Sequence, residues 1–100
     1  MDPMDRIRSK IPKPSLLESL AEESSELAHA ALKCSRILRG ENPTPVEYEE
    51  AEKNLVEEVT DVMVVLDALG YDKDIFVAVE KTKRWLKRLD DKEIENGKRD

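Results

Sequence analysis

The sequence has little of what several common classes of protein are built from. It contains one cysteine, one histidine and 4% aromatic residues, and it has no apolar run of about 18 residues. Because Cys34 is the sole cysteine, an intrachain disulfide and a thiolate zinc site within one chain are excluded. A formal net charge of −6 argues against binding a nucleic-acid polymer through bulk positive potential. We therefore expect a soluble, cytoplasmic protein with no nucleic-acid or membrane partner.

The residues that are abundant favour helices. Charged residues make up 40% of the chain, and leucine, valine, alanine, glutamate and lysine are common. We therefore predict an all-α fold. A length of 100 residues fits one small domain and permits only a modest core, so a partner chain would help to cover it.

Capping signals divide the chain into helices. Ser15 and Glu18 form a capping box at the start of the first helix, and Gly40 is placed to end it. Thr44 is a cap for the second helix, and Pro45 suits its first position, where no N–H is needed. We expect three helices, over residues 15–39, 45–69 and about 74–89.

The two ends of the chain carry weaker signals. Residues 1–14 hold three prolines and little periodicity, which predicts a flexible, extended N-terminal arm. Asp72 or Lys73 is expected at the start of the third helix, and residues 90–100 read as a charged, frayed C-terminal tail. The all-α domain is therefore expected to occupy residues 15–89.

The first two predicted helices are long for such a small domain. At 1.5 Å per residue, each would extend roughly 36 Å, and their short connection makes them antiparallel neighbours. A third helix alone would leave one side of that pair uncovered. We therefore expect a homodimer, or a dimer of dimers, that completes a four-helix-bundle-like core.

Two pairs of carboxylates share one spacing. Glu23 and Glu26 on the first helix are three residues apart, and Glu58 and Asp61 repeat this on the second. Like charges so placed repel each other, and a divalent cation such as Mg²⁺ would remove the repulsion. Asp61 lies in the most apolar stretch of the chain, which we expect to be mostly buried, and an ionised carboxylate taken out of water there must be paired, hydrogen-bonded or bound to metal. The structural alternative is that Asp61 faces solvent or a basic residue of the third helix.

The same pattern carries a family resemblance. Glu23-x-x-Glu26 is followed, after a turn beginning Gly40-Glu41-Asn42-Pro43, by Glu58-x-x-Asp61. Over roughly residues 16–89 the chain resembles the MazG-like nucleotide pyrophosphohydrolases of the all-α nucleoside triphosphate pyrophosphatase superfamily. Their signature is E-x-x-E followed by E-x-x-D.

The resemblance implies an enzyme of nucleotide pool housecleaning. The four carboxylates would be both metal ligands and catalytic residues, holding Mg²⁺, with Mn²⁺ as a substitute, against the phosphates of a nucleoside triphosphate. Water would attack the α–β linkage to give a nucleoside monophosphate and pyrophosphate. Relatives place basic residues of the following helix near the phosphates, and Lys81, Arg84 and Arg88 occupy that place in this chain, where their i, i+3, i+7 spacing predicts a shared face. Lys33 is a further candidate from its spacing alone, because it lies seven residues after Glu26 and so on a similar face of the first helix.

Other interpretations stay open. A phosphoribosyl-ATP pyrophosphatase has a similar carboxylate pattern. Glu26 and His29 form an E-x-x-H element of the kind found in di-iron helical bundles, although His29 is the sole histidine. A non-catalytic helical module with an acidic face is a further alternative. Trp85 is expected in the core or at a dimer interface rather than stacked on a base.

Overall fold

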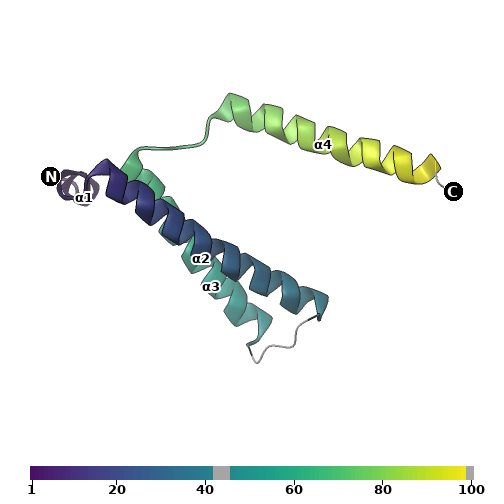
Figure 1. Cartoon of the computed structure of the whole chain (residues 1–100), viewed down its shortest axis with the longest axis horizontal. Coiled ribbons are helices and arrows are strands. Elements are labelled where there is room, and N and C mark those ends of the chain that lie inside the picture. The colour runs from purple at the N-terminus through teal and green to yellow at the C-terminus, as the bar shows by residue number, and fades with distance from the viewer. Residues whose placement is uncertain (42–45, 99–100) are drawn as a thin grey trace.

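Four helices make up the fold. The computed structural model describes residues 1–41 and 46–98, and within these ranges it contains helices and no strand (Figure 1). The predicted all-α class is therefore confirmed. In chain order the helices are α1 (Pro3–Lys10), α2 (Lys13–Arg39), α3 (Tyr48–Leu69) and α4 (Ile75–Lys98).

Helices α2 and α3 pack side by side as an antiparallel hairpin (Figure 1). Both end at a left-handed glycine, with φ of 66° at Gly40 and 78° at Gly70. A side chain would strain this backbone, whereas glycine adopts it freely and its N–H closes the last turn. The predicted ends of these two helices are confirmed.

The starts of the same helices differ from prediction. Helix α2 begins at Lys13 rather than Ser15, because Pro14 is tolerated in a first turn that needs no N–H. Helix α3 begins at Tyr48 with Glu47 as its N-cap, so the predicted start at residue 45 is wrong. The predicted cap Thr44 lies outside the described residues.

The N-terminal segment is helical, so the prediction of an extended arm is wrong. Pro3 occupies the first turn of α1, where its fixed φ suits a helix. Arg8 ties α1 to the end of α3: its Nε donates to the Ala68 carbonyl at 3.0 Å and its Nη2 to the Asp67 carbonyl at 2.7 Å. Both carbonyls lie in the last turn of α3, where the negative end of the helix dipole favours a cation, and the Asp67 carbonyl also accepts the Gly70 N–H at 3.0 Å.

Helix α4 also differs from prediction. Its cap is Asp74, whose Oδ1 accepts the N–H of Val77 at 3.0 Å, rather than Asp72 or Lys73. It continues to Lys98, well past the expected end near residue 89, so residues 90–98 are helical. Figure 1 shows α4 standing apart from the hairpin, which it therefore does not cover.

The chain is extended and has a thin core. Its radius of gyration is 18.8 Å, against about 13 Å for a compact domain of this length. The buried apolar residues of the described ranges are Leu16, Cys34, Ala51 and Ala68, which line the α2–α3 contact. No helix of the described part is both long and apolar enough to cross a membrane. A bundle completed by a second copy remains a prediction.

We expect Arg8→Ala to lower the free energy of unfolding by about 1 kcal/mol, since it removes two hydrogen bonds to carbonyls at the end of α3 together with an exposed ion pair to Asp5 at 3.0 Å. Arg6→Ala removes the same charge from the same helix, and its side chain makes no described contact. Urea denaturation of both variants measures the difference. Equal losses in the two variants would show that only charge matters.

Candidate metal centre

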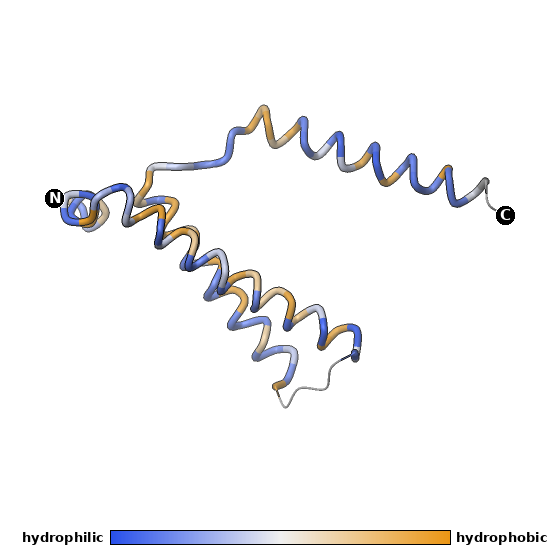
Figure 2. The backbone as a smooth tube through the Cα atoms, viewed as in Figure 1, coloured by the Kyte–Doolittle hydropathy of each residue, from blue (hydrophilic) through white to orange (hydrophobic). Residues whose placement is uncertain are grey.

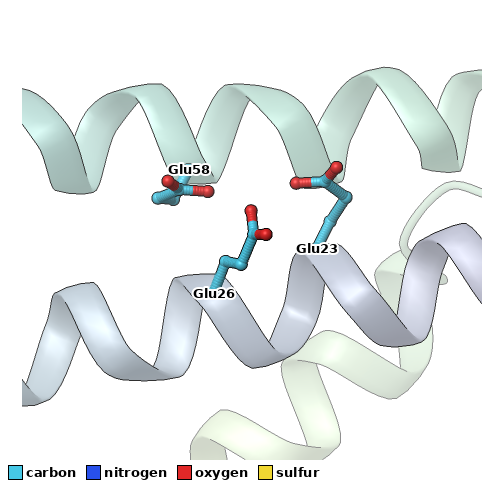
Figure 3. Close-up of side chains that lie close together, drawn as sticks. All are labelled: Glu23, Glu26 and Glu58. Atoms are coloured by element: carbon cyan, nitrogen blue, oxygen red, sulfur yellow. The ribbon is translucent and has the colours of Figure 1, made fainter.

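Three carboxylates from two helices meet inside the hairpin. One oxygen each from Glu23 and Glu26 of α2 and Glu58 of α3 lie within 4.8 Å of one another. Figure 3 shows the three side chains directed into the space between the helices, with Glu26 between the other two. The structure therefore brings together three of the four carboxylates that the sequence singled out.

Helix packing holds these groups in place. Glu23 and Glu26 are one turn apart and so leave the same side of α2. Ala51 stands two turns before Glu58 on α3 and is 2% exposed. Because positions seven apart share a helix face, this small buried residue marks the α3 face that packs on α2. Glu58 is thereby directed towards the α2 pair.

The cluster is electrostatically unfavourable without a cation. Partial burial, followed by repulsion from Glu26 and Asp61, raises the pKa of both Glu23 and Glu58 above the ordinary value of 4.5. The Oε2 atoms of these two glutamates are buried and, within the described structure, accept no hydrogen bond. Buried oxygens of this kind need a partner. A hard divalent cation fits such an all-oxygen donor set, and Glu23, Glu26 and Glu58 would hold it.

Asp61 lies at the edge of the cluster. Its charge acts on Glu23 and Glu58, yet its oxygens are not in the set that lies within 4.8 Å. The side chain is exposed, contrary to the expectation that the apolar stretch around it is mostly buried. In one chain, part of that stretch faces solvent, as the exposed Met63 and Val64 show. The exposed position of Asp61 agrees with the solvent-facing form of the structural alternative, whereas no ion pair of the described residues joins Asp61 to a basic residue of α4.

An open groove leads away from the carboxylates along the hairpin. It has a volume of about 470 Å³ and is lined by residues of α2 and α3, including Glu26, Glu58, Lys33 and Asn54. Lys33, proposed from its spacing after Glu26, thus shares a groove with two of the acids. Asn54 was not singled out, although its position four residues before Glu58 places it on the same side of α3.

The predicted basic residues of α4 lie elsewhere. Lys81, Arg84 and Arg88 share a hollow of about 250 Å³ with Trp85, and this hollow has no lining residue from the hairpin. Their shared face, expected from the i, i+3, i+7 spacing, is confirmed. Because α4 stands apart in Figure 1, one chain does not bring them to the carboxylates.

Histidine and cysteine take no part in the cluster. His29 lines the groove beside Glu26 but is not in the set of ligand atoms that the described residues bring together. Of the E-x-x-H element proposed for a di-iron site, only Glu26 therefore belongs to the cluster. Cys34 is 5% exposed within the α2–α3 contact and behaves as a small apolar residue, as expected.

Comparison of the chain with protein-family models, curated proteins and solved structures finds no match. Its function is therefore inferred from its own sequence and geometry.

The raised pKa values predict how stability depends on pH without divalent ions. In the folded state Glu23 and Glu58 keep their protons to higher pH than in the unfolded chain. The free energy of unfolding therefore falls as pH rises from about 4.5 through the raised pKa values. Glu23→Gln/Glu58→Gln should flatten this part of the profile and be the more stable form at neutral pH. Denaturant melts across pH measure both proteins, and parallel profiles would contradict the prediction.

Metal binding gives a second prediction. We expect Mg²⁺ or Mn²⁺ to raise the melting temperature of the chain, and Glu58→Gln to weaken the ion's affinity roughly tenfold by removing one ligand. Glu50→Gln, on the exposed start of α3, removes the same charge outside the cluster and serves as control. Calorimetric titration with Mn²⁺ measures the affinities. Equal weakening by both substitutions would indicate charge attraction without a defined site.

Proposed function

We propose that this protein is a Mg²⁺-dependent nucleoside triphosphate pyrophosphohydrolase of the MazG-like kind. The observation that carries the proposal is the cluster of Glu23, Glu26 and Glu58, with two buried carboxylate oxygens that lack a hydrogen-bond partner. Mn²⁺ is the expected substitute ion, since both metals prefer oxygen ligands. The resemblance of the E-x-x-E and E-x-x-D pairs to that family supplies the reaction.

In the proposed reaction the carboxylates bind the cation, and water cleaves the substrate. Glu23, Glu26 and Glu58 would hold the ion, and Asp61 would add a fourth carboxylate at the edge. A divalent cation held there would supply charge neutralisation for the phosphates and a lowered pKa for a water molecule, the chemistry that attack on the α–β linkage needs. Cleavage of that bond by water yields a nucleoside monophosphate and pyrophosphate.

The groove beside the cluster suits the rest of the nucleotide. Lys33 is half-buried and lines the same groove as Glu26 and Glu58, so its ammonium group is a candidate partner for phosphate oxygens. Asn54 offers both an amide donor and an acceptor for a sugar or base. Lys81, Arg84 and Arg88 line a hollow of α4 without any residue of the hairpin, so their contact with phosphate remains a prediction. A dimer or dimer of dimers is part of the proposal, because a single chain leaves much apolar surface exposed.

The decisive experiment is the product assay. The purified chain is incubated with Mg²⁺ and a panel of canonical and modified nucleoside triphosphates and phosphoribosyl-ATP, and pyrophosphate, monophosphate and orthophosphate are each measured. We expect pyrophosphate and monophosphate in equal amounts, and a fall on the order of a hundredfold in kcat/KM for Glu58→Gln. Glu50→Gln should retain full activity.

Other results would redirect the assignment. Orthophosphate release would place the cut at the terminal phosphate and contradict the proposed bond. Hydrolysis of phosphoribosyl-ATP, and of no other substrate in the panel, would favour the alternative that the protein is a phosphoribosyl-ATP pyrophosphatase. A chain that hydrolyses none of the panel, yet binds Mn²⁺ at the cluster, would favour a non-catalytic module.

A further inference from the structure

Helix α3 exposes an apolar stripe that no part of residues 1–41 or 46–98 covers. Val56, Val59 and Met63 are 57%, 38% and 58% exposed and follow the i, i+3, i+7 spacing of one helix face. The stripe leads into a hollow of about 370 Å³, where Met63 is joined by Leu66 and Tyr71. An apolar face of this extent on a chain of this size indicates an interaction surface.

The stripe and the acidic groove lie on different sides of α3. At 100° per residue, Val56, Val59 and Met63 point on average roughly 130° away from Glu58. A partner packed on the stripe would therefore leave the groove beside Glu58 open.

Helix α4 carries the complementary surface. Ile75, Val79, Leu86 and Leu89 repeat at helical spacing and are 47–67% exposed, with Trp85 beside them at 64%. Figure 2 shows such apolar positions recurring along α4, and in Figure 1 the helix stands alone. A helix of 24 residues with an uncovered apolar face gains little stability by itself, because tertiary packing supplies most helical stability.

The net charges of the helices favour α4 over a second α3 as the helix that packs on the stripe. Helix α3 carries seven acidic residues and one basic residue, a net charge of −6, so two α3 helices placed together would repel. Residues 75–89 of α4 carry five basic residues and one acidic residue, a net charge of +4. Complementary charge of this size favours α4 against α3 and disfavours the symmetric alternative.

The direction in which the chain leaves α3 indicates that the α4 helix on the stripe comes from a second copy of the chain. Arg8 holds the last carbonyls of α3, and the Lys13 ammonium lies 5.4 Å from the Tyr71 ring centroid, so the start of the connection is fixed against α1 and α2. Asp74 then caps an α4 that points away from its own hairpin (Figure 1).

We propose that two copies of this chain exchange their α4 helices, each packing its apolar face on the Val56–Val59–Met63 stripe of the other. The exchange is reciprocal, so it closes as a two-fold dimer. It does not depend on the proposed hydrolase activity, and it is tested without a substrate.

Matched substitutions at adjacent residues test the surface. Met63→Glu places an acid in the stripe, whereas Val64→Glu places the same acid on the neighbouring side of α3 at similar exposure, 48% against 58%. Sedimentation equilibrium should show a dimer for the parent chain, at least roughly tenfold weaker association for Met63→Glu, and little change for Val64→Glu. A parent chain that is monomeric at its highest soluble concentration, or equal effects of the two substitutions, would overturn the proposal.

Trp85 reports which helix is buried. As the sole tryptophan, its emission should be blue-shifted in the dimer and move to the red on dilution or in Met63→Glu. A dimer in which Trp85 emission stays that of an exposed indole would place α4 outside the interface and overturn the exchange.

Cross-linking distinguishes an α4 that packs on the α3 of another chain from an α4 that folds back onto its own hairpin. Unlabelled and nitrogen-15-labelled chains are refolded together and treated with a carbodiimide, which joins lysines to nearby carboxylates. Exchange predicts mixed-isotope peptides that link lysines of α4 to acids of α3. If such links form only within chains of one isotope, α4 packs on its own hairpin and the proposal fails.

Discussion

The packing of α2 on α3 holds three carboxylates together against their mutual repulsion, and this opposition sets the chemistry of the hairpin. Apolar contacts around Leu16, Cys34, Ala51 and Ala68 keep the helices side by side although Glu23, Glu26 and Glu58 oppose it. The raised pKa values of Glu23 and Glu58 reflect the same opposition, because burial and like charge both disfavour ionisation. A divalent cation at this position, as proposed above, would offset this cost.

Outside the α2–α3 contact, the hairpin has one polar face and one apolar face. One holds the open groove beside Glu58, where Lys33 and Asn54 accompany the acids. The other exposes the stripe of Val56, Val59 and Met63. Because a roughly 130° rotation about α3 separates them, binding on one face need not obstruct the other. Helix α3 can thus contribute to a polar site on one face and to an apolar interface on the other. In a single chain the polar groove is open and the apolar stripe is exposed.

Local signals in the sequence predicted the features that depend on neighbouring residues. Gly40 and Gly70 end their helices because only glycine adopts the required backbone cheaply, and the i, i+3 carboxylate pairs face one way because helix geometry requires it. The helical N-terminus was missed because its prolines were read as helix breakers, whereas Pro3 sits in a first turn and Arg8 finds its partners about 60 residues away. No periodicity encodes such a long-range contact. Asp61 was expected to be buried because its stretch is apolar, but burial there depends on what covers α3.

The structure of a single chain is therefore best understood as two incomplete surfaces on one stable hairpin. A divalent cation would neutralise the acids between the helices, and a basic, amphipathic α4 from a second copy would cover the apolar stripe outside them. Both additions would supply positive charge to a helix with a net charge of −6 and so would reduce the repulsion among its acids. The thin core and the large radius of gyration go together, since much of the apolar surface of α3 and α4 is exposed in a single chain.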